Sequence, residues 1–432
     1  MTTAVPLSTS GPGTSKPSAD ATTEYDTIVV GAGFAGLTLA IALAEGLPTG
    51  HRIALVDHRT TPVGPRDSST DARAVALSAA SVRLLTTLGI WPQISAFAQP
   101  VSIIELTDSA LKAGIRPVLL SYETALDTGE RSAFILPNAI LEAACAEAAA
   151  SRPAITAIDG VDVARLTTDP EHATLTLSDG RSLRARLIVG TDGRRSKMRE
   201  LAGISTVGWR YAQSGITVTV AHDEPHGGKA VQHFLPGGPF ALLPLPGNRT
   251  CITWSENEAE AARIMALDDD AFLAEAERRV GGRLGTIRLD GRRQSWPLEM
   301  FMARSFVGTR VALAGDAAHG VHPIAGQGLN LGLKDVAALA EVVVDQARVG
   351  LDIGAPSALA RYERWRRFDT FTAAAGFDAL NRLFSNDTGL LRTLRSMGLG
   401  VVDNFPFLKR ALVAEAAGTT GTLPRLIRGE AL

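Results

Sequence analysis

Three glycine-containing segments, far apart in the 432-residue chain, hold residue types that could cradle a flat, anionic ligand. The first is GAGFAG at residues 31–36, and the second is TDG at residues 191–193. The third begins at Gly315 and Asp316 and continues into HPIAGQGLNLGLKD, residues 322–335. Bare backbone can lie close to a ligand, and the start of a helix offers unpaired N–H groups and a positive dipole to negative charge.

The first segment has the context of a dinucleotide site, because it separates a predicted strand, Tyr25 to Val30, from a predicted helix. The first glycine permits the turn, the second lets backbone approach a pyrophosphate, and the third allows close packing. A second predicted strand ends in Asp57, where a carboxylate can bind an adenosine ribose. The alternative is a tight turn without a ligand. The expected contacts are Gly31, Gly33, Phe34, Ala35, Gly36 and Asp57.

Two later acids favour FAD over NAD as the dinucleotide. Asp192 and Asp316 each follow a predicted strand, at residues 187–190 and 311–314. A carboxylate at the end of a strand can bind a hydroxyl of a polyol chain that lies across the sheet. FAD has a ribityl chain and NAD does not. Asp192, Gly193, Gly315 and Asp316 are therefore expected cofactor contacts.

The third segment predicts a loop that leads into a helix beginning near Leu329 or Asn330. A reduced isoalloxazine ring carries negative charge near its N1 and O2 atoms, where a helix N-terminus stabilises it. The alternative is a glycine-rich connection with an ordinary cap. The expected flavin-ring loop comprises His322, Pro323, Gly326, Gln327, Gly328, Leu329 and Asn330, and the first four of these are the candidate catalytic residues.

Asp316, His319 and His322 also have a spacing that metal ligands can show. No carboxylate or cysteine cluster completes such a set in the sequence, so no metal is expected. His322 could act as an acid or base, or could simply support the loop backbone through hydrogen bonds.

A family resemblance rests on four segments: GAGFAG, DARAVALSAASVRLLTTLGIW at residues 71–91, Asp192-Gly193, and GDAAHGVHPIAGQGLNLGLKD at residues 315–335. Together they resemble class A flavoprotein monooxygenases. More narrowly, they resemble the ubiquinone-biosynthesis hydroxylases, relatives of para-hydroxybenzoate hydroxylase, over residues 25–410. The resemblance implies FAD, with Arg73 and Asn138 as further contacts and Asp316 on the ribityl hydroxyls.

The resemblance also implies a reaction. In this family the reduced flavin reacts with O2 to form a C4a-hydroperoxide that hydroxylates an electron-rich ring, sheltered here by the Pro323 loop. The implied substrate is a prenylated phenol or quinone precursor of ubiquinone. A single GxGxxG leaves the external reductant open between NAD(P)H and an electron-transfer partner.

The expected fold class is α/β, with a Rossmann-like FAD-binding domain, an inserted antiparallel-sheet substrate domain and C-terminal helices. The substrate domain is expected because residues 205–255 alternate polar and apolar side chains. The DDD run at residues 268–270 predicts a capped helix start. The expected divisions are a disordered tail at 1–24, the FAD-binding domain at 25–104, 131–200 and 303–350, the substrate domain at 105–130 and 201–302, and helices at 351–432.

Aromatic residues of the substrate domain could line a pocket or could simply fill the core. They are Trp209, Tyr211, Phe234, Phe240, Trp254 and Trp296. The apolar stretch from Met397 to Leu412 could likewise be core, or could dock on a membrane or a biosynthetic complex.

Composition excludes other classes. The chain has 45% hydrophobic and 20% charged residues with a net charge of −2, which gives no sign of a nucleic-acid partner. No run of uncharged apolar residues is long enough to span a membrane. Cys145 and Cys251 are far apart, as in a reducing compartment. The expected location is the cytoplasm, with peripheral contact at the inner membrane left open.

Three alternatives to hydroxylation of a prenylated ring stay open. A hydroxylase of a small soluble aromatic acid would need a residue such as Arg210 or Tyr211 to hold the carboxylate. A flavin-dependent reductase of isoprenoid double bonds would consume no O2. A scaffold subunit could bind FAD without catalysis, although it would not need to keep the ring loop. The oligomeric state is not determined by these residues.

Overall fold

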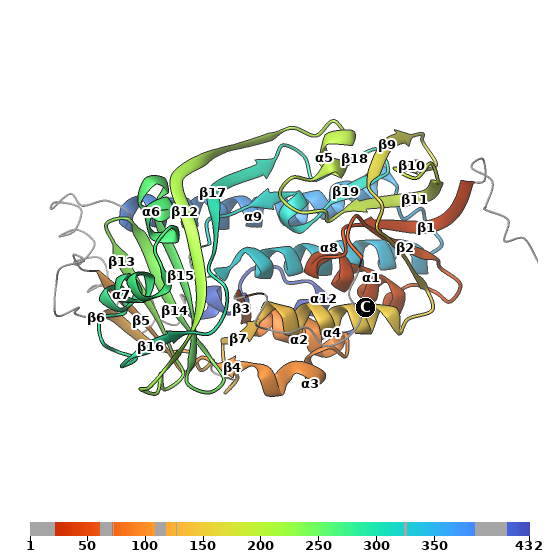
Figure 1. The fold of residues 1–432 in the computed structure, drawn as a ribbon. Helices are drawn as coiled ribbons and strands as arrows, with labels where there is room; N and C mark the ends of the chain where they lie inside the picture. Colours follow the sequence, from red (N-terminus) through yellow and green to blue (C-terminus); the bar gives the residue numbers. More distant parts are fainter. Residues whose placement is uncertain are drawn as a thin grey trace, which may run out of the picture.

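The computed structural model describes residues 22–60, 71, 73–108, 118–126, 128–323, 326–384 and 413–432. Figure 1 shows two lobes, with a large antiparallel sheet on the left and a sheet covered by helices on the right. The expected α/β fold is confirmed, since a parallel sheet carries the GxGxxG turn and a second sheet forms the other lobe.

The parallel sheet brings the ends of its strands to one edge. Its central strand β1 (Thr22–Val30) pairs in parallel with β11 (Ser182–Gly190) and β2 (Ile53–Asp57). Strand β11 pairs in parallel with β19 (Val311–Leu313), and β2 with β8 (Ile155–Asp159). Because parallel strands end at the same edge, the three glycine-containing segments meet there, although they are far apart in the sequence.

Other elements complete this lobe. Helix α1 (Phe34–Gly46) packs against α4 (Asn138–Ala150) and α8 (Gly328–Arg348). Helix α8 begins within two residues of the predicted start. The remaining elements of the lobe are β3 (Ala74–Ser78), α2 (Ala79–Thr87), α3 (Trp91–Ile94), η1 (Ser95–Phe97), β4 (Gln99–Pro100), β7 (Ala133–Pro137), β9 (Val163–Thr168), β10 (Ala173–Leu177), α5 (Lys197–Leu201), β18 (Val307–Gly308) and η2 (Gly315–Ala317).

The second sheet has the strand order β20-β17-β12-β15-β14-β13-β5-β6, with β16 beside β12. All of its pairings are antiparallel except that of β13 with β5. Strand β12 carries an irregularity between Arg210 and Ser214. The strands are β5 (Ile103–Asp108), β6 (Val118–Glu123), β12 (Thr206–His222), β13 (Lys229–Leu235), β14 (Gly238–Leu245), β15 (Arg249–Asn257), β16 (Ile287–Leu289), β17 (Gln294–Ala303) and β20 (His319–Gly320).

One face of this sheet is covered by α6 (Glu258–Met265) and α7 (Asp269–Val280). Phe240 and Trp254 are buried there, and Phe234 is also buried, so these three aromatics are core residues. Asp268 caps α7 by accepting a hydrogen bond from the Ala271 N–H at 2.8 Å, as predicted. Trp209 is 42% exposed, and its role is taken up below.

The C-terminal part of the described chain covers α8. Helix α9 (Pro356–Phe384) packs along α8, and α12 (Arg425–Arg428) packs on α2 and α8. The predicted docking stretch from Met397 to Leu412 lies outside the described residues, as do residues 1–21 of the expected tail. Strand β1 already begins at Thr22, before the predicted Tyr25.

A buried ionic cluster joins α8, α9 and the segment after β19. The Asp335 carboxylate is fully buried and accepts hydrogen bonds from Arg366 Nε at 2.8 Å and the Gly315 N–H at 3.1 Å. His319 Nε2 lies 2.6 Å from the same carboxylate. Burial by itself would raise the pKa of Asp335, but His319 and Arg366 outweigh it, and the pKa is lowered.

We expect the Asp335→Ala variant to lose about 3 kcal/mol of unfolding free energy, because it leaves the buried Arg366 guanidinium short of a partner. Denaturant titration of the purified protein measures this loss. The control is Asp345→Ala, which removes half-exposed pairs with Arg361 and Arg425 and should cost less than about 1 kcal/mol. Equal losses in the two variants would contradict the assigned importance of the cluster.

Candidate active site

The three glycines of the first turn have different surroundings. Gly31 has a φ of +105°, and a Cβ there would lie 2.6 Å from the Thr191 carbonyl oxygen. A Cβ on Gly36 would lie 1.8 Å from the Gly31 carbonyl oxygen. By contrast, a Cβ on Gly33 would meet nothing within 4 Å. Gly31 and Gly36 therefore serve close packing, while the space beside Gly33 stays open at the start of α1.

Helix α1 begins at Phe34 and Ala35 with no side chain capping its N-terminus, so its first N–H groups are available to a ligand. Asp57, at the end of β2, accepts hydrogen bonds from the Ala32 N–H at 2.6 Å and the Arg59 N–H at 2.7 Å. Burial would raise the pKa of Asp57, but these two bonds and the Arg59 guanidinium together outweigh it, so the pKa is lowered. The carboxylate thus fixes the glycine turn, and its contact with a ribose stays a prediction.

Asp192 holds the protein's own backbone. Its carboxylate accepts hydrogen bonds from Ser196 Oγ at 2.5 Å and from the Met198 N–H at 2.9 Å, at the start of α5. The adjacent Gly193 has a φ of +81° and open space where a Cβ would be. The backbone of Gly193, more than the side chain of Asp192, is thus positioned to lie close to a ligand.

Asp316 lies in the turn after β19 with its side chain 45% exposed, and it pairs with Arg194 at 3.2 Å. Gly315 before it has a φ of +60° and lies beside Gly332 of α8 and Ala35 of α1. The carboxylate of Asp316 is therefore accessible at the sheet edge, as a contact to a polyol requires.

Arg73 and Asn138 lie next to each other, because the Asn138 N–H donates to the Arg73 carbonyl oxygen at 3.1 Å. The Arg73 guanidinium forms two hydrogen bonds with Asp71, at 2.9 and 2.8 Å, and this pair raises the pKa of Arg73. Asn138 is buried at the start of α4, and its Oδ1 atom has no hydrogen-bond partner among the residues that the structure describes. Such an unpaired buried acceptor is expected where a ligand supplies the missing donor.

The flavin-ring loop is anchored by Asn330. Its Oδ1 atom accepts hydrogen bonds from the Ser78 N–H at 3.0 Å and Ser81 Oγ at 2.7 Å, and its Nδ2 atom donates to the Ala76 carbonyl at 2.9 Å. Asn330 therefore joins the start of α8 to β3 and α2, with no side-chain group left over for the ring. Gly326 has a φ of +63°, and a Cβ there would lie 3.1 Å from Ala76 Cβ.

Gln327 occupies the cap position of α8, and its side chain makes no capping hydrogen bond with the described residues. Gly328 and Leu329 form its first turn, and the Gly326 N–H donates to the Pro323 carbonyl oxygen at 3.1 Å. The free N–H groups of this turn form a second positive helix end that can receive negative charge.

His322, at the start of this loop, is buried, and neither of its ring nitrogens is hydrogen-bonded to any of the described residues. Its ring lies 5.1 Å from that of Tyr211, at an interplanar angle of 84°. Tyr211 lies in the irregular part of β12 and donates to Asp378 of α9 at 2.7 Å. Burial lowers the pKa of His322 to about 4, so the imidazole is neutral near pH 7.

Two residues of this cluster escaped the sequence analysis. Asp378 and Asn381 come from the second half of α9, where Asn381 Nδ2 donates to Gln213 Oε1 at 3.2 Å. Their three-residue spacing on a helix was the only available signal, and such spacing is also usual for solvated residues. Their placement against β12 required the tertiary structure.

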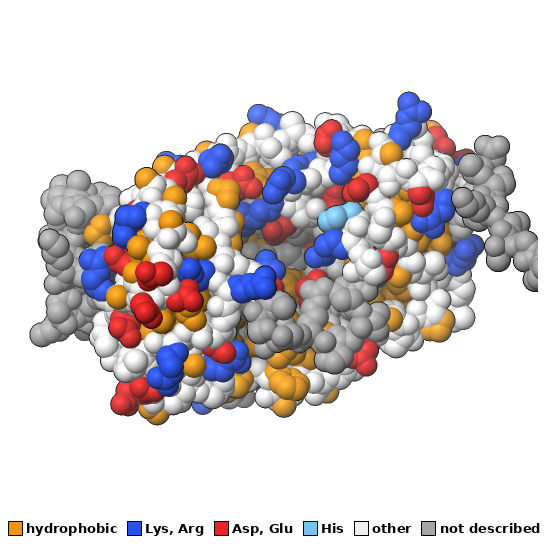
Figure 2. Space-filling model, in the orientation of Figure 1, with side chains coloured by type: hydrophobic (Ala, Val, Ile, Leu, Met, Phe, Trp, Pro, Cys, Tyr) orange, Lys and Arg blue, Asp and Glu red, His pale blue; other side chains and the backbone are white. Residues whose placement is uncertain are grey.

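The residues fit FAD. Two uncapped helix starts, the open space beside Gly33 and Gly193, and the unpaired Asn138 Oδ1 lie on segments that the sheet edge and β7 bring together. Figure 2 shows the surface hollowed between the two lobes, with basic and acidic side chains along the rim. Positive helix ends suit the pyrophosphate and the reduced ring of such a cofactor.

Comparison with known proteins decides the family. The FAD binding domain family matches residues 24–367. The chain belongs to the FAD-dependent monooxygenase family. This monooxygenase is 42% identical over 407 residues to the ubiquinone hydroxylase UbiL of Rhodospirillum rubrum, over 94% of this chain and 92% of the relative. It is 32% identical over 398 residues to 3-demethoxyubiquinol 3-hydroxylase of Escherichia coli, over 90% and 97% of the two chains.

A solved structure has the same fold. The p-nitrophenol 4-monooxygenase PnpA of Pseudomonas putida matches with a TM-score of 0.77 and 20% identity, over 93% of this chain and all of that one. This likeness extends over both lobes of the monooxygenase, and it concerns the fold alone.

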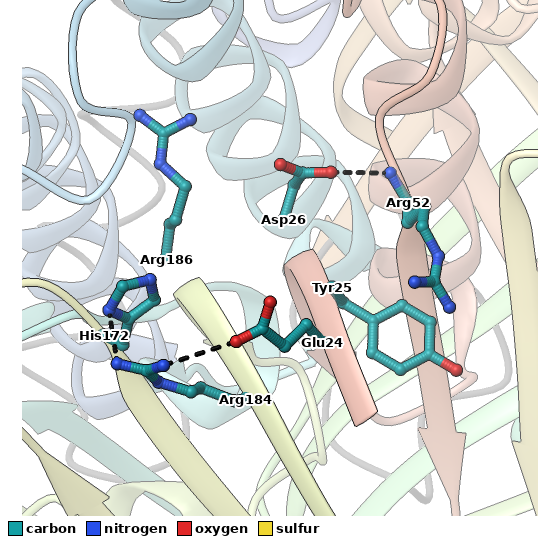
Figure 3. Close-up of a pocket in the computed structure, with 7 residues that line it drawn as sticks. All are labelled: Glu24, Tyr25, Asp26, Arg52, His172, Arg184 and Arg186. Atoms are coloured by element: carbon teal, nitrogen blue, oxygen red, sulfur yellow. Dashed lines mark hydrogen bonds and ion pairs between the residues drawn. The ribbon is translucent and has the colours of Figure 1, made fainter. Parts of the chain in front are cut away.

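A separate cavity of about 260 Å³ lies at the opposite end of β1 from the glycine turn (Figure 3). Several of its polar groups already have partners: Arg184 donates to Glu24 at 3.3 Å and lies 3.0 Å from His172 Nδ1. Asp26 accepts from the Arg52 N–H at 2.8 Å. These pairs give the cavity a structural explanation.

The described residues give no sign of a metal centre or of a membrane-spanning helix. No group of three His, Cys, Asp or Glu side chains among them could hold a metal ion, and His319 is instead bound to Asp335. None of the helices in the described part of the chain is long and apolar enough to cross a membrane.

We expect Gly33→Ala to leave the unfolding free energy of the FAD-free monooxygenase within about 0.5 kcal/mol of wild type, because the added methyl meets no protein atom within 4 Å. The same methyl should weaken FAD binding roughly tenfold or more, since it takes space beside the pyrophosphate. Flavin fluorescence titration measures the affinity. Gly36→Ala is the control and should destabilise the fold itself, and unchanged FAD affinity in Gly33→Ala would refute this placement.

His322 predicts a dependence of stability on pH. Its folded-state pKa of about 4 lies below the ordinary 6.5, so the unfolded chain takes up the proton first as the pH falls. The unfolding free energy should therefore fall below about pH 6.5, by up to roughly 1.4 kcal/mol per pH unit, until about pH 4.

Denaturant titrations of wild type and His322→Gln at neutral pH and at about pH 5 measure this contribution. We expect the loss of stability on acidification to be smaller in His322→Gln than in wild type. The exposed His58 provides the control, because His58→Gln should behave as wild type. Identical pH dependence in all three proteins would show that His322 is not held neutral by burial.

Proposed function

We propose that this protein hydroxylates the aromatic ring of a prenylated phenol or quinone precursor in ubiquinone biosynthesis, with FAD as cofactor and O2 as the oxygen source. The observation that carries the proposal is the likeness to ubiquinone hydroxylases over 90% or more of the chain. Bound FAD would supply the redox chemistry that activates O2 and transfers one oxygen atom to the ring.

The chain itself would bind and orient this cofactor. The turn at Gly31, Gly33 and Gly36 and the start of α1 would receive the pyrophosphate, with Asp57 fixing the turn. Asn138 and Asp316 would contact hydroxyl groups through Oδ1 and the accessible carboxylate. The uncapped start of α8 would stabilise negative charge on the reduced ring.

His322 would position the substrate. A neutral imidazole with two unpaired nitrogens can accept a hydrogen bond from a phenol hydroxyl without placing a charge in a dry pocket. Tyr211 stays protonated, because burial and the bond to Asp378 raise its pKa. Pro323, Gly326 and Gln327 would shape the surrounding loop and exclude water from the reacting atoms.

The surroundings of Arg210 argue against a small aromatic acid as substrate. A soluble acid would need a cation inside the pocket, but the Arg210 side chain is 65% exposed and pairs with Glu258 at 2.9 Å.

The proposed reaction also requires an external reductant. The chain has one GxGxxG, which the FAD is proposed to use, so the reductant is either NAD(P)H bound without such a motif or an electron-transfer partner.

The test uses purified protein loaded with FAD, reduced without oxygen and then mixed with isotopically labelled O2 and a prenylated phenol. We expect a ring-hydroxylated product that carries one labelled oxygen atom, because a monooxygenase takes that atom from O2. Oxidation of the flavin without labelled product, with this substrate and with shorter prenyl chains, would contradict the proposed function. A reduced double bond in the prenyl chain would instead support an isoprenoid reductase.

A further inference from the structure

An exposed groove with a volume of about 460 Å³ lies between α9, the start of β12 and the end of β17. Its lining residues are distinct from the residues proposed to bind FAD, and none of them has a part in the proposed reaction. The residues that give the groove its character are Val207, Arg304, Arg364, Arg367, Phe368 and Phe371.

The groove exposes large apolar side chains. Phe368 is 77% exposed, Phe371 is 56% exposed and Val207 is 46% exposed. The opposite face of α9 is buried through Tyr362 and Arg366, so the two phenylalanines cannot also pack against the lobe. Apolar side chains grouped on a surface in this way mark an interaction site.

The same groove is positively charged. Arg304, Arg364 and Arg367 are exposed, and within the part of the chain that the structure describes none of them pairs with a carboxylate. The one acid of the groove, Glu363, is used internally, since it accepts hydrogen bonds from Ser305 Oγ at 2.8 Å and the Phe306 N–H at 2.9 Å. Counted over the described residues, the groove therefore presents three unpaired arginines around an apolar centre.

We propose that this groove docks on the surface of an anionic phospholipid bilayer, with Phe368 and Phe371 inserted among the acyl chains and the three arginines at the lipid phosphates. Apolar side chains flanked by basic residues are the combination that an anionic interface binds. The choice of a bilayer over an acidic soluble partner rests on the proposed prenylated substrate, which resides in the membrane.

The groove adjoins the inferred substrate site. Along β12, Val207 lines the groove, Trp209 follows it, and the Trp209 ring lies 6.4 Å from that of Tyr211. Tyr211 in turn contacts His322. Apolar and aromatic side chains thus lead from the docking surface to the flavin-ring loop, as a substrate that enters from a bilayer requires.

The experiment is flotation of the full-length, FAD-loaded protein with vesicles of phosphatidylcholine, or of phosphatidylcholine and phosphatidylglycerol in equal parts. We expect binding to the anionic vesicles only, and loss of it in Phe368→Ser with Phe371→Ser. Arg364→Gln with Arg367→Gln should weaken it about 30-fold, from the loss of two surface charges. The controls are the exposed pair Val349→Ser with Leu351→Ser, and Arg165→Gln with Arg292→Gln, which should bind as wild type.

Three results would overturn the proposal. Wild type could float with neither vesicle, or the phenylalanine variant could bind as wild type. A dimer in solution that the phenylalanine variant converts to a monomer would assign the groove to a second copy of the chain. Because flotation needs no turnover, a failed hydroxylation assay with intact vesicle binding would refute the proposed function and leave the docking surface standing.

Discussion

The burial of the Asp335 carboxylate is the constraint on which the site depends. A buried carboxylate must find donors, and Asp335 finds them on three elements, at Arg366 of α9, at His319 of β20 and at the Gly315 N–H. These bonds fix the turn after β19 against α8. They therefore fix the position of Asp316 relative to the start of α8, the two places proposed to contact the ribityl chain and the ring of the flavin.

The proposed FAD site offers the ligand backbone groups more than polar side chains. Asp57, Asp192 and Asn330 lie in the motifs predicted to bind the cofactor, yet each uses its side chain to hold the protein's own backbone. Among the described residues, the groups left available are N–H groups at two helix starts, the Oδ1 atom of Asn138 and the half-exposed carboxylate of Asp316. Such preorganised dipoles bind charge without having to reorient when the ligand arrives.

The second lobe contributes through one irregular stretch of strand. Between Arg210 and Ser214 the pairing of β12 with β17 shifts, and this stretch carries Tyr211 toward His322 and Gln213 toward Asn381. Irregularities of this kind redirect side chains beside active sites. Helix α9 is fixed on two sides. Its Arg366 binds Asp335 of α8 in the lobe of the parallel sheet, and its Asp378 binds Tyr211 of β12 in the other lobe. It therefore connects the two lobes at the inferred substrate position.

The sequence by itself determined the elements whose signals are local. The strand and glycine turn at Gly31, the capped helix after Asp268 and the start of α8 follow from spacing, turn chemistry and capping, which act over a few residues. Only the tertiary structure decided which polar side chains remain free, since Asn330 finds its partners Ser78 and Ser81 on a segment about 250 residues away in the sequence. For the same reason the neutral state of His322 and the contacts of Asp378 could not be predicted: burial depends on packing between lobes, and no local pattern encodes it.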